Sequence, residues 1–182
     1  MILWRWAPLI GLLVWGAWKL VGWGAVPWET SAQVGALLNL FILVVLSFGG
    51  AWVKLRSGEE FPDFLTAFRE VSKAPLRFAA LAAAGLFVWY GTVAADGLDA
   101  RRERMKSEAR ALVEDDAQWA AFVEAQGGGE WDREVALEQQ LATIDTIFDE
   151  RLFLGLSLLG LVIAAVMASA VATVLWRTVW SK

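Results

Sequence analysis

The chain contains no cysteine and no histidine, and it has only one tyrosine and four prolines. Without cysteine or histidine it cannot form the usual zinc sites, an iron–sulfur cluster, a thiol nucleophile, a histidine-ligated haem or a histidine general base. It also has no glycine-rich phosphate loop and no alternating pattern typical of β-strands. We therefore expect no catalytic residue, no cofactor and no metal centre, and we interpret the protein as a non-enzyme.

Apolar residues are in large excess. They make up 58% of the 182 residues, and the mean hydropathy is +0.50, whereas soluble domains are about 45–50% apolar. A bilayer core of about 30 Å needs about 20 apolar residues in a helix. Four stretches reach that length, and they cover residues 2–26, 32–53, 76–95 and 152–179. The sequence predicts an all-α, polytopic membrane protein with three transmembrane helices in residues 1–95 and a fourth in residues 152–182.

The first apolar run allows two interpretations. Its position after Arg5 is compatible with a cleavable signal peptide, but no small-x-small cleavage site follows and the run continues to Trp28. This favours an uncleaved first span. Lys19 lies inside the run, and we expect its long stem to carry the ammonium group to the lipid headgroups.

The distribution of lysine and arginine predicts the orientation in the membrane. Residues 27–31 contain neither, whereas residues 54–77 contain Lys54, Arg56, Arg69, Lys73 and Arg77. Positive charge gathers on the cytoplasmic side, so we expect the second connection and both termini in the cytoplasm. The basic residues within 101–110 argue against this orientation, although long translocated segments follow the charge rule poorly.

The segment of residues 62–73 has the spacing of an amphipathic helix. Apolar side chains recur at helical intervals and are Phe61, Phe64, Leu65 and Phe68. Pro62 suits a first helical turn, and Pro75 is predicted to end the segment before the third span. We expect a short helix lying in the membrane interface. It would serve either as a connector packed on its own bundle or as a docking site for another protein.

Residues 96–151 form the only long polar region. Apolar residues on both sides of Gly127–Gly129 follow steps of three and four, which predicts an extramembrane hairpin of two facing helices. Without a breaker after Arg133, the second arm is expected to continue into the fourth span. The aromatic residues of the arms are Trp119, Phe122, Trp131 and Phe148. We predict that they anchor a partner protein, the alternative being that they lie on the membrane surface or cap the hairpin's own seam.

Two further patterns bear on partners. Acidic runs at residues 114–116 and 145–150 are interpreted as solvated helix faces, with a calcium or magnesium site as the weaker alternative. The net charge of the chain, −4, gives no support for nucleic-acid binding. The fourth span carries small residues at four-residue intervals, namely Gly160, Ala164, Ala168 and Ala172. Such rows let membrane helices approach closely, so we expect helix contacts within the chain or with another subunit.

The order of these elements, together with Phe64, Ala67 and Phe68 in the charged connector, resembles an uncharacterised family of small four-span bacterial inner-membrane proteins. The resemblance implies location and architecture, because that family has no assigned activity.

Two functional hypotheses follow from the sequence. The first is a non-catalytic accessory or scaffold subunit of a larger bacterial membrane complex, in contact with lipid and with other membrane subunits. The alternative is a small stand-alone transport, channel or lipid-handling protein, with a pathway lined by Asn39 and Ser47.

Overall fold

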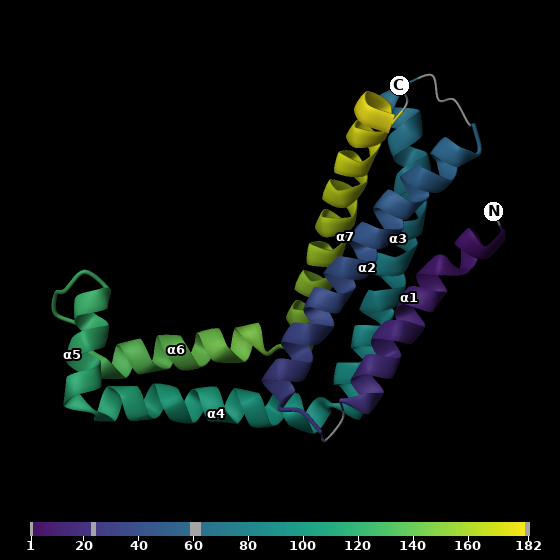
Figure 1. Cartoon of the computed structure of the whole chain (residues 1–182). Coiled ribbons are helices and arrows are strands. Elements are labelled where there is room, and N and C mark those ends of the chain that lie inside the picture. Colours follow the sequence, from purple (N-terminus) through teal and green to yellow (C-terminus); the bar gives the residue numbers. More distant parts are fainter. Residues whose placement is uncertain (1, 23–24, 59–62, 181–182) are drawn as a thin grey trace. The chain divides into compact units, whose positions relative to one another are not determined.

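The structure is a computed structural model and describes every residue except 1, 23–24, 59–62 and 181–182. The described part is all-helical, as the sequence predicts, with seven α-helices and two π-helical segments. In order these are α1 (Ile2–Val21), α2 (Trp28–Arg56), α3 (Phe64–Val88), η1 (Trp89–Val93), α4 (Ala95–Glu114), α5 (Asp116–Ala125), α6 (Arg133–Ile147), α7 (Glu150–Leu175) and η2 (Trp176–Trp180) (Figure 1).

The chain divides into two compact units. We call Met1–Val88 with Leu156–Lys182 the bundle, and Trp89–Gly155 the insert. Helices α1, α2 and α3 pack against one another in the bundle, and α4 packs against α5 and α6 in the insert (Figure 1).

Among the described residues, three helical segments are long and apolar enough to cross a membrane. They are Glu29–Arg56, Phe64–Val93 and Arg151–Thr178, and they carry large exposed apolar side chains such as Phe41 and Met167. Exposed apolar surface of this kind suits contact with lipid, which indicates a membrane protein. Helix α1 is not among the three, because four tryptophans together with Arg5 and Lys19 dilute its aliphatic residues.

The centre of the bundle is made of small and closely fitted side chains. Gly11 of α1 faces Ile42 of α2 and the fully buried Phe78 of α3. Farther along, a buried cluster joins α2, α3, α7 and η2 through Ala51, Ala67, Val71, Ala172 and Trp176. Small residues at these contacts let the helix backbones approach closely, which is a main source of helix association in lipid.

Helix α3 differs from the sequence prediction. It begins after Asp63, whose carboxylate accepts hydrogen bonds from the backbone N–H and the hydroxyl of Thr66, and it continues without interruption through Pro75. The predicted helix end at Pro75 was therefore wrong, and the segment expected to be a separate interfacial helix is the first part of α3.

Tertiary packing explains how α3 tolerates this proline. Pro75 has no N–H to bond to the carbonyl of Val71. That carbonyl faces Gly50 of α2, where a Cβ atom would lie 3.5 Å from the oxygen. Pro75 itself is almost fully buried, so packing against the bundle compensates for the missing hydrogen bond.

In this part of α3 the predicted interfacial residues divide between the two sides of the helix. Phe64 and Leu65 are exposed, Phe68 is half-buried and stacks on Phe64, and Ala67 is in the bundle core. Phe61 lies outside the described residues.

The insert also corrects the predicted hairpin. Its first arm is two helices rather than one, because Asp115 has an extended backbone and its carboxylate accepts hydrogen bonds from the N–H groups of Ala117 and Gln118. Asp132 caps α6 in the same way. These are typical N-cap interactions. Between them Gly127, Gly128 and Gly129 all have positive φ, which favours glycine and confirms the predicted turn.

The second arm does not continue into the last apolar helix as expected. Helix α6 ends at Ile147, and α7 begins at Glu150. Asp149 accepts a hydrogen bond of 3.0 Å from the N–H of Leu152, so a new helix N-terminus is formed there. Local side-chain capping thus stops a helix where the sequence shows no glycine or proline.

Candidate functional sites

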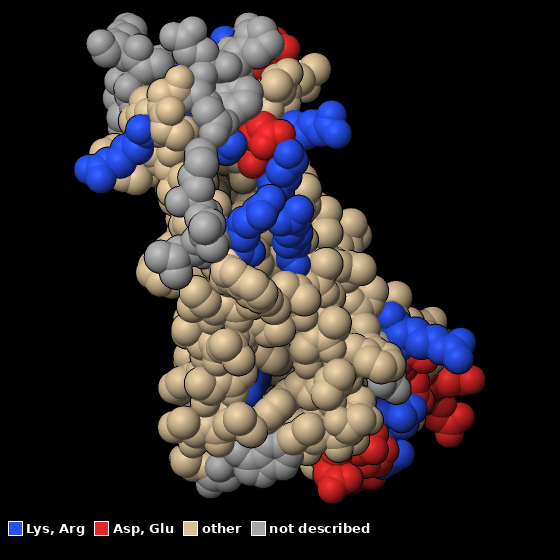
Figure 2. All heavy atoms as spheres, turned by 90° about the vertical axis from the view of Figure 1, so that its right-hand side faces the viewer, with Lys and Arg blue, Asp and Glu red and all other residues tan. Residues whose placement is uncertain are grey.

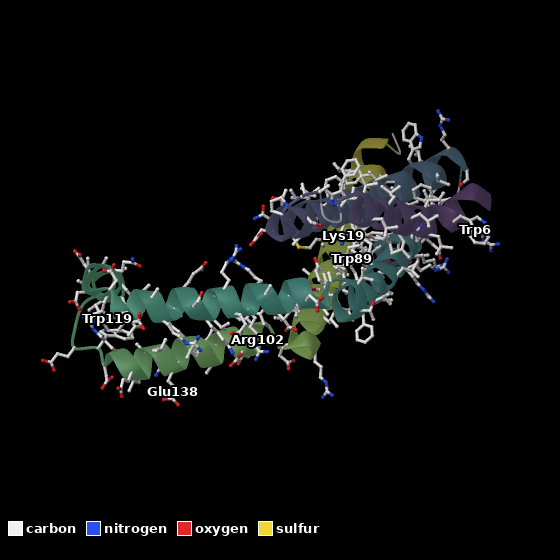
Figure 3. All side chains as sticks on the ribbon, turned by 90° about the horizontal axis from the view of Figure 1, so that it is seen from below. Trp6, Lys19, Trp89, Arg102, Trp119 and Glu138 are labelled. Carbon is white, nitrogen blue, oxygen red and sulfur yellow. The ribbon has the colours of Figure 1, made fainter. Side chains whose placement is uncertain are left out.

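Three of the four aromatic residues predicted to anchor a partner form one cluster in the insert. Trp119 stacks on Phe122 with ring centroids 5.5 Å apart, and Phe122 meets Trp131 edge-to-face at 6.1 Å. The guanidinium group of Arg133 lies 5.6 Å from the centroid of Trp119. Trp119, which is labelled in Figure 3, is 8% exposed and Trp131 is 41% exposed, so the first is used mainly in packing and the second remains accessible.

Phe148, the fourth predicted anchor, lies at a separate site. It lines a cavity of about 280 Å³ together with Tyr90, Arg102 and Asp145. The ring of Tyr90 meets Phe153 edge-to-face at 5.4 Å. Sequence distance could have separated Phe148 from the other three, because it lies 19 residues after Gly129, whereas the others lie within eight residues of the glycine turn.

An apolar groove lies beside the aromatic cluster. It has a volume of about 480 Å³, and its apolar lining includes Met105 and Leu112 of α4, Phe122 of α5, Trp131, and Ile144 and Ile147 of α6. The polar residues of the lining are Glu108, Gln139, Gln140 and Thr143. The facing stripes predict a closed seam, whereas the structure leaves an open groove between them. Which side chains meet across two helices depends on their relative rotation, which spacing alone does not define.

An ion-pair cluster holds α4 and α6 together. Asp145 accepts a hydrogen bond of 2.7 Å from Nε of Arg102, pairs with Nη2 of the same residue, and lies 2.6 Å from Nζ of Lys106. The hydrogen bond from Lys106, followed by that from Arg102, holds the pKa of Asp145 below its usual value. Figure 3 shows Arg102 between the two helices. Asp145 is thus part of a structural contact.

No cluster of three or more acidic residues in the described ranges is arranged to hold a metal ion. In the predicted acidic run at residues 114–116, Asp115 caps α5 and Asp116 pairs with Arg133 at 2.6 Å.

The small-residue row of α7 is only partly used within the chain. Gly160 is exposed, Ala164 and Ala168 are half-buried, and Ala172 is in the bundle core. The face that packs inside the bundle lies beside this row and consists of Leu161, Ala165, Ser169, Thr173 and Trp176. The rest of the predicted row is therefore left available for contact with lipid or another helix.

Several polar residues of the bundle helices are buried. Lys19 is 2% exposed and donates a hydrogen bond of 2.9 Å to the carbonyl of Ser31, so the expectation that it reaches the headgroups was wrong. Asn39 and Ser47 are also buried, and the hydroxyl of Ser47 lies 3.3 Å from that of Ser169. Lys19 and Ser47 find protein partners that lipid cannot offer, whereas the buried Oδ1 atom of Asn39 has no hydrogen-bond partner in the described part of the chain. Burial in packed helices gives no support to the pathway considered for Asn39 and Ser47.

Comparison with known proteins finds no matching family model, no matching curated protein and no matching solved structure. The resemblance to small four-span inner-membrane proteins therefore stays a prediction, and function has to be inferred from the geometry above.

Proposed function

We propose that the protein is a non-catalytic accessory or scaffold subunit of a larger protein complex in the bacterial inner membrane. In this proposal α1 is a fourth span beside the three apolar segments, both termini are cytoplasmic, and the insert is an extramembrane helical hairpin. The insert and the open edge of α7 then bind other membrane subunits.

The observation that carries the proposal is the open apolar groove of the insert. Covering apolar surface that is exposed to water lowers the free energy. The groove has such surface, because Ile147, Phe122 and Trp131 lie along one opening. Its polar lining residues Gln139, Gln140 and Thr143 can bond to polar groups at the edge of a bound segment. A groove with an apolar centre and a polar margin suits the apolar face of one helix. We infer that this helix belongs to another subunit.

The edge of α7 supplies a second contact in the proposal. Gly160 has no atom within 4 Å of the position that a Cβ would occupy, so another helix can approach its backbone closely. Ala164 and Ala168 continue this edge. Contacts in the membrane and outside it would together fix the orientation of a partner.

A matched pair of substitutions on α6 tests the proposal. Ile147 and Val135 are both 51% exposed, but only Ile147 is a groove residue. We expect Ile147→Gln to release the partner during purification in mild detergent, while Val135→Gln leaves a stoichiometric complex. Mass spectrometry of the purified complexes gives the readout.

Site-specific photocrosslinking tests the same contact even if the complex dissociates during purification. A photoreactive residue at position 147 should crosslink to one partner that also co-purifies, and the same residue at position 135 should not. Equal crosslinking at both positions, or a monomer without a stoichiometric companion, would contradict the proposal.

A further inference from the structure

A cavity between α1, α2 and α3 in the bundle is lined by an unusual concentration of positive charge. Its volume is about 370 Å³. Four cationic side chains line it, Arg5 from α1, Lys54 from α2, and Lys73 and Arg77 from α3, against one carboxylate, Glu70. Four positive charges and one negative charge leave a net charge of +3 around one small opening. Figure 2 shows lysine and arginine side chains gathered on this face of the molecule.

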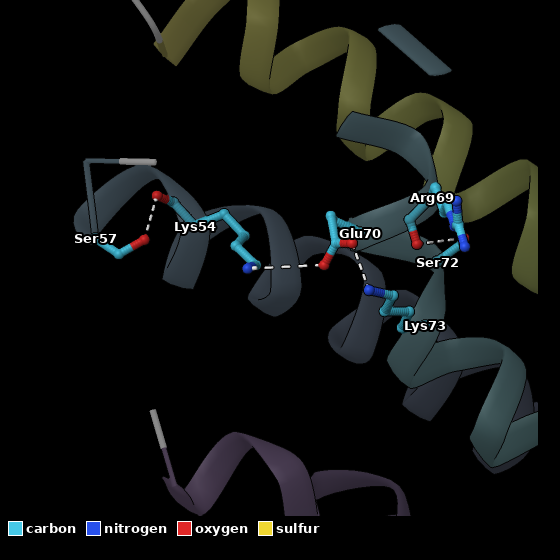
Figure 4. A network of polar contacts seen from close by, with 6 residues as sticks. All are labelled: Lys54, Ser57, Arg69, Glu70, Ser72 and Lys73. Atoms are coloured by element: carbon cyan, nitrogen blue, oxygen red, sulfur yellow. Dashed lines mark hydrogen bonds and ion pairs between the residues drawn. The ribbon is translucent and has the colours of Figure 1, made fainter. Parts of the chain in front are cut away.

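The carboxylate is used to hold the lysines. Glu70 pairs with Lys73 and lies 3.9 Å from Nζ of Lys54 (Figure 4). Neither Arg5 nor Arg77 forms an ion pair or a hydrogen bond with the residues that the structure describes. Two guanidinium groups therefore line the cavity with their hydrogen-bonding capacity unused by the described part of the chain.

The remainder of the cavity lining is apolar. Pro8, Val53 and Ala74 contribute to it, and Trp4 closes one side. The indole ring of Trp4 lies against Gly49 and Gly50, and a Cβ at Gly50 would be 3.7 Å from it. A cavity that combines cationic side chains with an apolar wall matches the chemistry of a molecule that has an anionic head and an apolar body.

The position of the cavity along the helices agrees with a membrane interface. Lys54 lies in the last turn of α2, where the apolar segment Glu29–Arg56 ends, and Arg5 lies near the start of α1. In the proposed orientation this end of the bundle faces the cytoplasm. The headgroups of the cytoplasmic leaflet carry negative charge, and basic pockets between membrane helices on that side attract them.

We propose that this cavity binds the phosphate group of an anionic lipid from the cytoplasmic leaflet, with Arg5 and Arg77 as its ligands. The planar guanidinium group can donate two parallel hydrogen bonds to phosphate oxygens. Lys54 and Lys73 add charge at the opening, and the apolar wall contacts the start of the acyl chains. The inference depends on the membrane insertion in the proposed function but not on any partner subunit.

The experiment compares two pairs of substitutions that remove the same charge. Arg5→Gln with Arg77→Gln removes the two proposed ligands. Arg56→Gln with Arg69→Gln removes two arginines of α2 and α3 that do not line the cavity. Each full-length protein is equilibrated in detergent with equal amounts of phosphatidylglycerol and phosphatidylcholine of identical acyl chains, and native mass spectrometry measures the lipid retained. Circular dichroism shows whether each variant keeps its helices.

We expect the unmodified chain and the Arg56/Arg69 variant to retain one phosphatidylglycerol in preference to phosphatidylcholine. The Arg5/Arg77 variant should retain it about tenfold less well, because charge-assisted hydrogen bonds are among the strongest in proteins. Equal losses in the two variants would overturn the proposal, since the attraction would then be an unspecific effect of surface charge. Equal retention of the two lipids by the unmodified chain would also overturn it.

Two further measurements complete the test. Excess inorganic phosphate should leave the retained lipid in place, and complete displacement would show that the cavity is a site for a free anion instead. Arg5→Lys with Arg77→Lys keeps the charge and is the variant to use if the glutamine pair loses its helices. It should weaken retention several-fold, because lysine cannot offer the paired donors of arginine, and unchanged retention would contradict the assigned ligands.

Discussion

The close approach of α1 to α2 and α3 leads to a sharp prediction for Gly11. A Cβ atom at this position would lie 2.7 Å from Cγ2 of Ile42 and 3.2 Å from two ring carbons of Phe78. Phe78 is fully buried, so its ring has no free space into which it can move. Gly11→Ala should therefore force the helices apart and destabilise the bundle.

The expected magnitude follows from a comparison on the same helix. Overpacking by one methyl group in a closely packed core typically costs about 1–3 kcal/mol, whereas Gly→Ala inside a helix gains about 1 kcal/mol from conformational propensity. Gly16 has no atom within 4 Å of the position that a Cβ would occupy. Gly16→Ala should therefore gain helix propensity without the free-energy cost of overpacking. The two variants should differ in free energy of unfolding by about 1–3 kcal/mol, and the propensity contribution cancels in this difference.

Reversible unfolding in mixed micelles, followed by far-ultraviolet circular dichroism, gives the free energies. Ile42→Ala removes the Cγ2 atom of the closest contact, so Gly11→Ala should cost about 1 kcal/mol less in that background. Equal stability of the Gly11→Ala and Gly16→Ala proteins would refute the reasoning. It would mean that α1 does not pack against α2 and α3 at this distance.

Three further predictions concern topology, pH and the edge of α7. A cysteine introduced at Gly128 should react with a membrane-impermeant maleimide in intact cells, and one at Ser57 only after permeabilisation; the opposite pattern would invert the proposed orientation. Because the pKa of Asp145 is lowered by Lys106 and Arg102, its stabilisation is present above the unfolded-state pKa of about 3.9 and is lost as pH falls through the lower folded-state pKa. The protection factors of the α6 amides, which correct for the intrinsic pH dependence of hydrogen exchange, should therefore fall in acid, and Asp145→Asn, unlike Glu138→Gln, should remove most of that fall. Gly160→Leu should leave the unfolding free energy nearly unchanged, because the site is open, but should release the partner; an intact complex would exclude this edge as a contact.

Several features of the fold were determined by sequence alone. Long apolar runs predict membrane helices because the thickness of the bilayer sets a length that local composition can satisfy, and three such segments are present. The turn at Gly127–Gly129 was equally predictable, since its positive φ angles are easily adopted by glycine. These features depend on residues that are near one another in the chain.

Helix ends were decided partly by tertiary structure. Pro75 reads locally as a helix end, yet α3 continues through it because Gly50 on another helix lies beside the carbonyl that the proline leaves without its usual donor. The breaks at Asp115 and Asp149 have the opposite character. Each break is made locally by one aspartate that caps the next helix. Because aspartate also occurs in helices without acting as a cap, residue spacing does not predict these breaks.

The candidate sites were decided almost entirely by tertiary structure. The cationic cavity combines Arg5, Lys54 and Arg77 from three helices, and in the sequence these residues are only scattered basic positions. Likewise, the sequence predicts a small-residue row on α7, but the rotation of that helix determines that Ala165 and Ser169 are buried while Gly160 is exposed. Composition and periodicity describe each helix by itself. A pocket or a contact face depends on how several helices are rotated and spaced, and that is set by side-chain packing between residues far apart in the chain.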